Sequence, residues 1–331
     1  MTTRYSSVHQ SPNGPGDGRP TAKQIIEDEN LEGRLEGKVV FVTGCSSGIG
    51  VETARALFLT GATLYLTARN LEKAESVLRD LVHTGRVHLL ALDLESLDSV
   101  RSCAAEFLSK SNTLDILICN AGIMAPPEGR TKDGFETQIG TNHLGHFLLF
   151  NLLQPALSAA VTPERSSRVV ILSSVAHRWG EFDPDNVNLE GSYDPMVAYG
   201  ASKTANLWTA NEIERRYGAQ GIHAWSVHPG LVLTDLGRHM SREQQEASMA
   251  DPYLALIAKN AEQGSATSVW AAVTAELEGY GGKYLEDCGI AEAWDPTAPQ
   301  SRPGYGSHAY DSEKAFKAWN KSMELVGIRL S

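Results

Sequence analysis

Several common classes of protein are excluded by what this sequence has little of. Only four of its 331 residues are cysteines, and these lie far apart without a Cys-x-x-Cys pair, which argues against a disulfide scaffold or a zinc site. The net charge of −11 leaves no basic stripe that could neutralise nucleic-acid phosphates. No apolar run reaches the ~18 residues of a membrane span. These absences favour a cytoplasmic protein that binds a small molecule, with no nucleic-acid partner and no membrane span.

The N-terminal part of the chain has no clear pattern. Residues 1–20 are rich in serine, proline and glycine and have no apolar core, so they fit neither a secretory signal nor a folded element. We therefore predict a disordered or extended segment over residues 1–34. The hydrophobic content of 42% is enough for one large core, which we place in a single domain over residues 35–331.

From residue 38 onwards, short apolar runs alternate with helical patterns. The runs predict strands at 38–44, 64–67, 87–92, 114–119, 168–172, 223–227 and 283–285. The alternation predicts an α/β fold: a doubly wound parallel sheet of about seven strands with helices on both faces. Ligands of such sheets bind beyond the carboxyl ends of the strands. The least regular stretches, 235–262 and 286–310, are predicted to form a lid over the substrate.

The first strand leads into a glycine-rich turn and then into a helical stretch. Gly44 permits the turn, Gly48 lets the backbone approach a pyrophosphate, and Gly50 allows close packing of the helix. The other turn residues expected at the phosphates are Ser46, Ser47 and Ile49. Three residues separate the first two glycines, which departs from the most familiar dinucleotide fingerprint. Glycines that merely make a tight turn are the alternative interpretation.

Tyr199 and Lys203 are four residues apart, so a helix would place the phenol and the ammonium on one face. A tyrosine titrates near ~10, and a neighbouring cation that stabilises the phenolate makes it a better acid or base at neutral pH. Ser173 and Ser174 lie upstream, and a serine hydroxyl from a strand end could hold a substrate oxygen beside the tyrosine. Alone, the spacing is weak, because such pairs are common on solvated helices.

Taken together, the motifs resemble the short-chain dehydrogenase/reductases. The resemblance covers residues 35–328 and rests on Thr43-Gly44-x-x-x-Gly48-x-Gly50, Asp93-Leu94, Asn120-Ala121-Gly122, Asn142, Ser174, Tyr199-x-x-x-Lys203, and His228-Pro229-Gly230 with Thr234. Within that family, the sequence around 140–147, 173–177 and 282–284 is similar to the retinol dehydrogenase and WW-domain oxidoreductase branch, and to fungal biosynthetic reductases.

The resemblance implies a Rossmann fold and a role for each matching residue. Tyr199 would exchange a proton with the substrate oxygen, Ser174 would orient that oxygen, Lys203 would bind the nicotinamide ribose, and Asn142 would hold a water of the proton relay. Ser173 would be structural. The implied cofactor contacts are Asp93 to the adenine amino group, Thr234 to the carboxamide, and Leu94, Asn120, Ala121, Gly122, Tyr199, Lys203, Pro229 and Gly230 along the cofactor. Similar proteins are commonly homodimers or homotetramers.

The end of the second strand bears on the choice of cofactor. NAD-preferring proteins usually carry an acidic side chain there, whereas this chain has Thr67-Ala68-Arg69-Asn70. Arg69 could pair with a 2′-phosphate, which predicts NADP(H). An arginine that is simply exposed at a strand end is the alternative.

Three histidines and one helix have more than one possible role. His143 and His146 could share a metal, although packing and hydrogen bonding are favoured. His177 fits a position beside the substrate and, equally, a capping or solvated one. From Asp311, a plausible N-cap, apolar residues recur at helical spacing (Phe316, Trp319, Met323 and Val326) and predict core or dimer packing.

The sequence therefore predicts an NADP(H)-dependent oxidoreductase that interconverts an alcohol and an aldehyde or ketone on a lipophilic or aromatic substrate of secondary metabolism. One alternative is a cofactor-binding regulatory or scaffold protein without turnover, against which the intact Ser174, Tyr199 and Lys203 argue. A reductase of a conjugated or phenolic ring is another.

Overall fold

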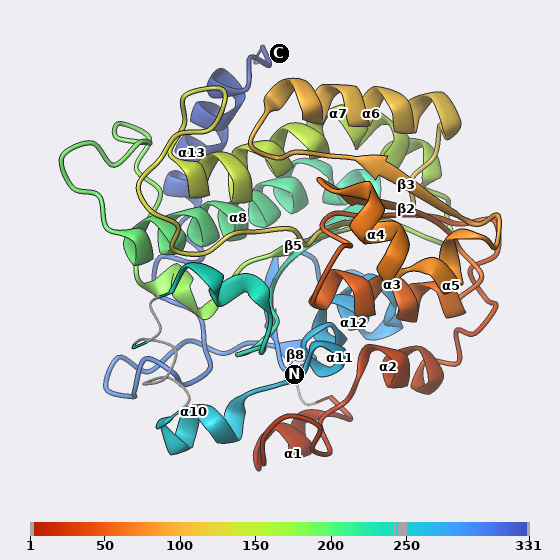
Figure 1. Cartoon of the computed structure of the whole chain (residues 1–331), viewed down its shortest axis with the longest axis horizontal. Helices are drawn as coiled ribbons and strands as arrows, with labels where there is room; N and C mark the ends of the chain where they lie inside the picture. Colours follow the sequence, from red (N-terminus) through yellow and green to blue (C-terminus); the bar gives the residue numbers. More distant parts are fainter. Residues whose placement is uncertain (1–2, 241–242, 244–249, 330–331) are drawn as a thin grey trace.

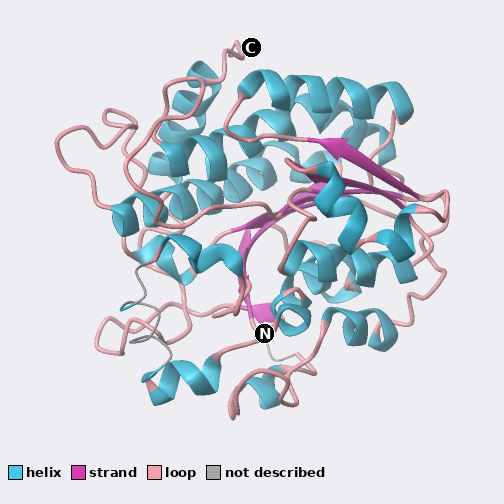
Figure 2. Cartoon of the chain, in the orientation of Figure 1, coloured by secondary structure: helices cyan, strands magenta, loops and turns pink. Residues whose placement is uncertain are grey.

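A twisted eight-stranded sheet forms the centre of the computed structural model, which describes residues 3–240, 243 and 250–329. Figure 2 shows helices packed on both faces of this sheet. The strands are β1 (Val39–Val42), β2 (Thr63–Ala68), β3 (Val87–Ala91), β4 (Ile116–Cys119), β5 (Ser167–Leu172), β6 (Ile222–His228), β7 (Lys283–Glu286) and β8 (Gly289–Ile290). Their order is β3-β2-β1-β4-β5-β6-β7-β8.

The first seven strands pair in parallel, and β8 pairs with β7 in antiparallel orientation. This arrangement confirms the predicted doubly wound α/β fold in one domain. All seven predicted strands are present, and their ends agree with the prediction to within two residues. The two-residue β8 was not predicted, because a strand that short leaves no apolar alternation in the sequence.

Alternate residues of each central strand belong to two different cores. Phe41 packs into the core beneath α6, α7, α8 and α13, whereas Val40 and Val42 pack into the core that contains α2, α3, α5 and α12. The side chains of a strand point alternately to the two faces of a sheet, so a strand covered on both faces is apolar throughout. Figure 1 shows α6 and α7 above the sheet and α2, α3 and α12 below it.

The helices around these cores have the following bounds. The upper layer consists of α6 (Leu97–Lys110), α7 (Gly145–Ala160), α8 (Pro195–Tyr217) and α13 (Ser312–Leu325). The lower layer contains α2 (Ala22–Asp28), α3 (Ile49–Leu59), α4 (Leu71–Val77), α5 (Arg79–Val82), α11 (Ala261–Gly264) and α12 (Ala266–Val273). Elsewhere lie α1 (Ser6–His9), α10 (Pro252–Ile257), the π-helical turn η1 (Ile139–Leu144), and the 3-10 turns η2 (Val175–Arg178), η3 (Gly218–Gln220), η4 (Asp235–His239) and η5 (Ala275–Leu277).

The C-terminal helix α13 begins where the sequence predicts. The Asp311 side chain accepts the backbone N–H groups of Glu313 and Lys314, and α13 packs along α8. Of the predicted apolar stripe, Trp319, Met323 and Val326 are buried, which confirms core packing, but Phe316 is 46% exposed. Among the described residues, no helix combines the length and the apolarity needed to cross a membrane.

The N-terminal segment is a correction to the prediction of a disordered or extended chain over residues 1–34. From residue 3 it contains α1 and α2, and Ile25 and Ile26 of α2 are fully buried against α12 and α3. Arg19, only 4% exposed, donates to the backbone carbonyls of Ile257 and Ala258 at 2.7 and 2.6 Å. The segment is ordered by these polar contacts and by one short apolar helix, and its composition indicates neither.

Candidate active site

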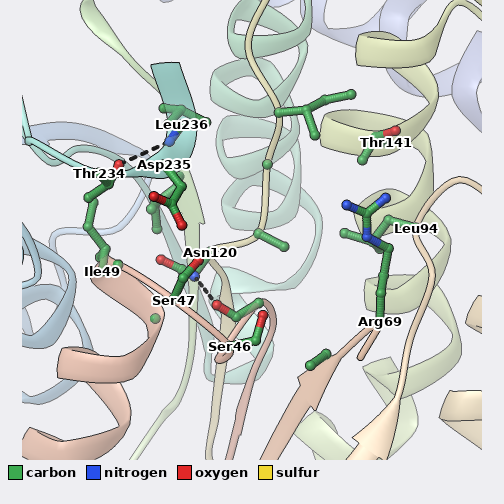
Figure 3. Close-up of a pocket in the computed structure, with 18 of the residues that line it drawn as sticks. Ser46, Ser47, Ile49, Arg69, Leu94, Asn120, Thr141, Thr234, Asp235 and Leu236 are labelled. Carbon is green, nitrogen blue, oxygen red and sulfur yellow. Dashed lines mark hydrogen bonds between the residues drawn. The ribbon is translucent and has the colours of Figure 1, made fainter. Parts of the chain in front are cut away.

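A cavity of about 430 Å³ opens at the carboxyl ends of the strands, where the sequence places the ligand. Predicted site residues that line it are Gly44, Ser46, Ser47, Gly48, Ile49, Gly50, Arg69, Asp93, Leu94, Asn120, Ala121, Gly122, Tyr199, Lys203, Pro229 and Thr234. Figure 3 shows Arg69 and Leu94 on one side of this pocket and Thr234 and Asp235 on the other, with Ser46 and Ser47 between them. Asn142, Ser174 and Gly230 lie outside its lining.

The glycine turn packs closely against the neighbouring chain because its glycines carry no side chains. A Cβ at Gly44 would lie 2.8 Å from the Ala121 Cβ, and one at Gly50 would lie 2.2 Å from the Gly44 carbonyl oxygen. Gly44 and Gly48 also have φ values of 76° and 58°, which side chains with a Cβ rarely adopt. The turn leads directly into the N-terminus of α3, whose backbone N–H groups suit an anion. The residues present therefore fit a dinucleotide pyrophosphate.

Behind this turn, one buried histidine joins the ends of β1 and η1. The Thr43 hydroxyl accepts the backbone N–H groups of Asn120 and Ala121 and lies 2.8 Å from His146 Nε2. His146 Nδ1 lies 2.9 Å from the backbone oxygen of Asn142. A carbonyl oxygen only accepts, so Nδ1 carries the proton, and Thr43 donates to Nε2. This network fixes the floor of the pocket.

Asn142 itself is fully buried in η1. Its side-chain oxygen accepts the Ile123 N–H at 2.9 Å, and its amide nitrogen donates to the Ile123 carbonyl and to the Ser202 hydroxyl at 2.9 and 3.0 Å. These bonds tie η1 to the end of β4 and to α8. The water-binding role that the resemblance implies for Asn142 stays a prediction.

Ser174 and Tyr199 are brought together by the packing of η2 against α8. A Cβ at Gly200 would lie 2.6 Å from the Ala176 carbonyl oxygen, so glycine is needed for the two backbones to approach this closely. The start of α8 is fixed by Asp194, whose side chain accepts two backbone N–H groups of the first turn. Tyr199 therefore lies on the second turn, facing the end of β5.

The two neighbouring serines have different partners. The Ser173 hydroxyl donates to the Lys203 backbone carbonyl at 2.8 Å, which suits the structural role expected of it. The Ser174 hydroxyl accepts the Ala176 N–H at 3.2 Å, so its own proton is free to be donated, and its proximity to Tyr199 acts to lower the pKa of that tyrosine. The Lys203 Nζ donates to the Leu172 carbonyl at 3.2 Å and lies 5.5 Å from the centre of the Tyr199 ring.

Burial has the largest effect on the pKa values of Tyr199 and Lys203. It raises the pKa of Tyr199 to about 12, against the opposing effect of the nearby Ser174 hydroxyl, and lowers the pKa of Lys203 to about 8. Tyr199 therefore holds its proton at neutral pH, which is the form that a proton donor requires. The expectation that Lys203 biases Tyr199 toward ionisation stays a prediction.

The histidines singled out in the sequence have separate structural partners. His143 Nε2 lies 2.7 Å from the Ser322 hydroxyl of α13, whereas His146 bonds to Thr43, so the two rings serve different contacts. No cluster of three potential metal ligands occurs in the described part of the chain. His177 is fully buried, so the solvated position considered for it is wrong.

The pocket also contains polar residues that the motifs do not indicate. Glu95 lies 3.0 Å from the Arg69 guanidinium, and Lys73 lies 4.0 Å from Asp235. The buried hydroxyl of Thr141 lines the pocket and has no hydrogen-bond partner among the described residues, which suits a wall that meets a polar ligand. Lys73 and Glu95 follow Arg69 and Asp93 by four and two residues, and this proximity is the only sequence signal for them.

Asp93 remains available as a hydrogen-bond acceptor. Lys132 Nζ lies 2.9 Å from one of its carboxylate oxygens, and the Glu95 N–H donates to the other at 3.2 Å. Burial raises the pKa of Asp93, but these two partners outweigh it and hold the pKa below its usual value. An ionised carboxylate suits the adenine amino group that the resemblance assigns to it.

Comparisons with known proteins agree with this geometry. The family model described as short chain dehydrogenase matches residues 38–245. The short-chain dehydrogenase/reductase prx1 of Penicillium roqueforti is 45% identical over 98% of this chain and 95% of its own length. Human retinol dehydrogenase 12 is 38% identical over 89% of this chain and 88% of its own. Among solved structures, the Pseudomonas aeruginosa RhlG/NADP active-site complex matches with a TM-score of 0.62 and 26% identity, over 76% of this chain and 95% of that one.

Proposed function

Since the chain belongs to the short-chain dehydrogenase/reductase family, we propose that it is an NADP(H)-dependent oxidoreductase that interconverts an alcohol and an aldehyde or ketone. One observation carries the proposal: Ser174, Tyr199 and Lys203 converge at the end of β5, beside a glycine turn that fits a dinucleotide. Catalysis requires that the proton donor and the cofactor-binding turn line the same pocket. Tyr199, Lys203 and the glycine turn all line this one.

The bound nicotinamide supplies the hydride in the reductive direction. Tyr199, which holds its proton, donates it to the carbonyl oxygen of the substrate. The Ser174 hydroxyl donates a hydrogen bond to the same oxygen and holds it beside Tyr199. Lys203 reaches the pocket with its Nζ fixed at the Leu172 carbonyl, from which it can bind the ribose hydroxyls.

Preference for NADP(H) is supported by the charges at the end of β2. Arg69 lines the pocket and is 59% exposed at its side chain, so its guanidinium can reach a phosphate, and Lys73 lies on the same wall. β2 itself ends in Ala68, where an NAD-binding strand would present a carboxylate. The similar RhlG structure is, by its name, a complex with NADP, which adds weight by similarity.

A lipophilic substrate is supported by exposed apolar side chains near the catalytic residues. Trp179 follows η2 and is 37% exposed, and Val197, two residues before Tyr199, is 36% exposed. The backbone of Gly180 packs against the Val197 carbonyl, so the segments that carry these two side chains are adjacent. The relative named retinol dehydrogenase acts, by its name, on a lipophilic alcohol.

Asp235 and Arg238 line the pocket, which supports a lid role for 235–262, although 241–242 and 244–249 lie outside the described residues.

The test is a side-by-side titration of the purified protein with NADPH and NADH, followed by a screen of aromatic and long-chain aldehydes and ketones. We expect tighter binding of NADPH and turnover of at least one lipophilic carbonyl. The Arg69→Ala variant should weaken NADPH by roughly 10–100-fold and leave NADH within a few-fold, because a charged hydrogen bond contributes ~1.5–3 kcal/mol. Equal losses for both cofactors would refute the phosphate contact, and binding without any turnover would favour the scaffold alternative.

A further inference from the structure

His177 lies between the catalytic serine and a distant part of the chain. Its Nδ1 is 2.6 Å from the backbone carbonyl oxygen of Ser174, and its Nε2 is 2.8 Å from the backbone nitrogen of Gly306. The side chain is fully buried, and the ring of Tyr284 packs against it with centroids 4.8 Å apart. One imidazole therefore joins the end of β5 to the C-terminal part of the chain.

These two partners determine the tautomer of His177. A carbonyl oxygen only accepts and a backbone N–H only donates, so Nδ1 carries the proton and Nε2 accepts from Gly306. A protonated ring would direct a second N–H group against the N–H of Gly306. Burial lowers the pKa of His177 to about 4, which keeps the ring neutral under ordinary conditions. The neutral ring therefore makes both contacts at neutral pH.

Gly306, which is bound to Nε2, directly follows an exposed loop over residues 292–305. Backbone hydrogen bonds between the two ends of this loop close it at its base. Arg178, the neighbour of His177, holds the same loop: it donates to the backbone carbonyls of Gln300 and Arg302, and its guanidinium lies 4.6 Å from the centre of the Trp294 ring. Consecutive residues of η2 thus hold the catalytic serine on one side and this loop on the other.

We propose that His177 is a positioning residue that fixes the backbone of Ser174 and anchors the 292–305 loop beside it. This inference rests on the proposed function, because it concerns how Ser174 meets the substrate oxygen. The place of the Ser174 hydroxyl follows from its own backbone, and a displacement of about 1 Å at a reacting group can cost roughly 100-fold in rate. His177 is fully buried and does not line the pocket, so it acts through Ser174.

Two substitutions separate the two contacts of His177. In His177→Asn the amide nitrogen can take the place of Nδ1 and still donate to Ser174, but no group reaches Gly306. In His177→Gln the amide oxygen can take the place of Nε2 and still accept from Gly306, but the side-chain bond to the Ser174 carbonyl is lost, and only the backbone N–H of residue 177 still donates to it at 3.1 Å. The matched control is Arg178→Ala, which removes a contact to the loop and leaves both bonds of His177 intact.

The experiment measures kcat, KM and NADPH affinity with the best carbonyl substrate of the screen, together with amide hydrogen exchange of peptides from 292–306. His177→Gln should lower kcat by roughly 10–100-fold, with NADPH affinity and exchange close to wild type. His177→Asn should keep kcat within a few-fold and exchange about tenfold faster. Arg178→Ala should also exchange faster and keep its kcat. A merely structural histidine would change rate and exchange together in both variants of His177.

Unchanged kcat in His177→Gln, or equal losses of kcat in both His177 variants, would overturn the inference. If His177→Gln does not fold, His177→Leu, which lacks both side-chain bonds, is compared with His177→Asn: exchange should be faster in both, and kcat should fall only in His177→Leu. Wild-type protein without turnover would instead refute the proposed function. Active wild type, inactive Tyr199→Phe and fully active His177→Gln would refute the positioning role alone.

Discussion

The two sides of the pocket are held together in different ways. On the cofactor side, the glycine turn follows β1, and β1 lies next to β4 in the sheet. The Thr43 and His146 network joins the ends of these two strands. On the substrate side, Ser174 depends on contacts between segments far apart in sequence, such as the bond from Gly306 to His177. The N-terminal segment depends on long-range contacts of the same kind, because Arg19 binds the carbonyls that end α10.

This difference explains why one fold can keep its cofactor and change its substrate. The cofactor side consists of strand ends whose positions the sheet register fixes, so a few glycines and an asparagine suffice to shape it. The substrate side consists of loops and short helices held by individual polar contacts, and each of these can be replaced without altering the sheet. Substitutions on the two sides should therefore have separable effects on cofactor binding and on turnover.

The largest effect is expected for Tyr199→Phe. This change removes the hydroxyl that donates the proton and keeps the ring that packs beneath the pocket, so kcat should fall by roughly 1,000-fold. NADPH affinity should stay within a few-fold, because the glycine turn and Arg69 are unchanged. Steady-state kinetics and a fluorescence titration of the same preparation measure both quantities. Near-normal turnover would remove Tyr199 from its assigned role, and a large loss of affinity would show that the two sides are not separable.

The next effect is expected for Arg19→Met, which breaks the anchor of the N-terminal segment. The change leaves Asp17 without its buried cation and leaves the carbonyls of Ile257 and Ala258 without their donor. Loss of one partner of a buried, hydrogen-bonded pair typically costs ~3 kcal/mol, so urea unfolding should show a loss of about that size. NADPH affinity should be preserved. A variant as stable as the wild type would mean that the segment contributes little to the fold.

The two sides also differ in how far the sequence predicts them. Alternating apolar runs located all seven parallel strands, and the residues from Gly44 to Gly50 lie where their spacing implies. The N-terminal segment was missed because Arg19 orders it through backbone carbonyls, which any sequence provides. The role of His177 was left open for the same reason: its partners are a carbonyl oxygen and the amide of a glycine 129 residues away. Long-range contacts to the backbone leave no pattern in composition or periodicity.

A smaller effect, common to both sides, is expected from pH. Burial lowers the pKa values of His146 on the cofactor side and His177 on the substrate side to about 4, against 6.5 for an exposed histidine. The unfolded chain therefore binds more protons than the folded chain as the pH falls from about 6.5 to about 4, and stability decreases over that range. Each histidine contributes a slope of ~1.4 kcal/mol per pH unit.

Urea unfolding at pH 7.0, 6.0 and 5.0 measures this slope. Replacement of either ring by glutamine, in His146→Gln and His177→Gln, should remove about the same part of the pH dependence, whatever its effect on stability at pH 7. Two variants with the full wild-type slope would show that these rings titrate normally in the folded chain. A smaller pH dependence in only one variant would mean that only that histidine has a lowered pKa in the folded chain.

The smallest effect, and the sharpest test of the cofactor side, is expected for Glu95→Gln. The Glu95 carboxylate lies 3.0 Å from the Arg69 guanidinium, where it competes with a 2′-phosphate for the same donors and repels its negative charge. Because both side chains are partly exposed, solvent and salt weaken the interaction, and the gain in NADPH affinity should be about three- to fivefold at low salt and smaller at higher salt. NADH affinity and kcat should not change, since NADH carries no 2′-phosphate and the Glu95 carboxylate is paired with Arg69. Equal gains for NADPH and NADH would mean that Glu95 acts on a part common to both cofactors, and Arg69 would then lose its assignment as the residue that distinguishes them.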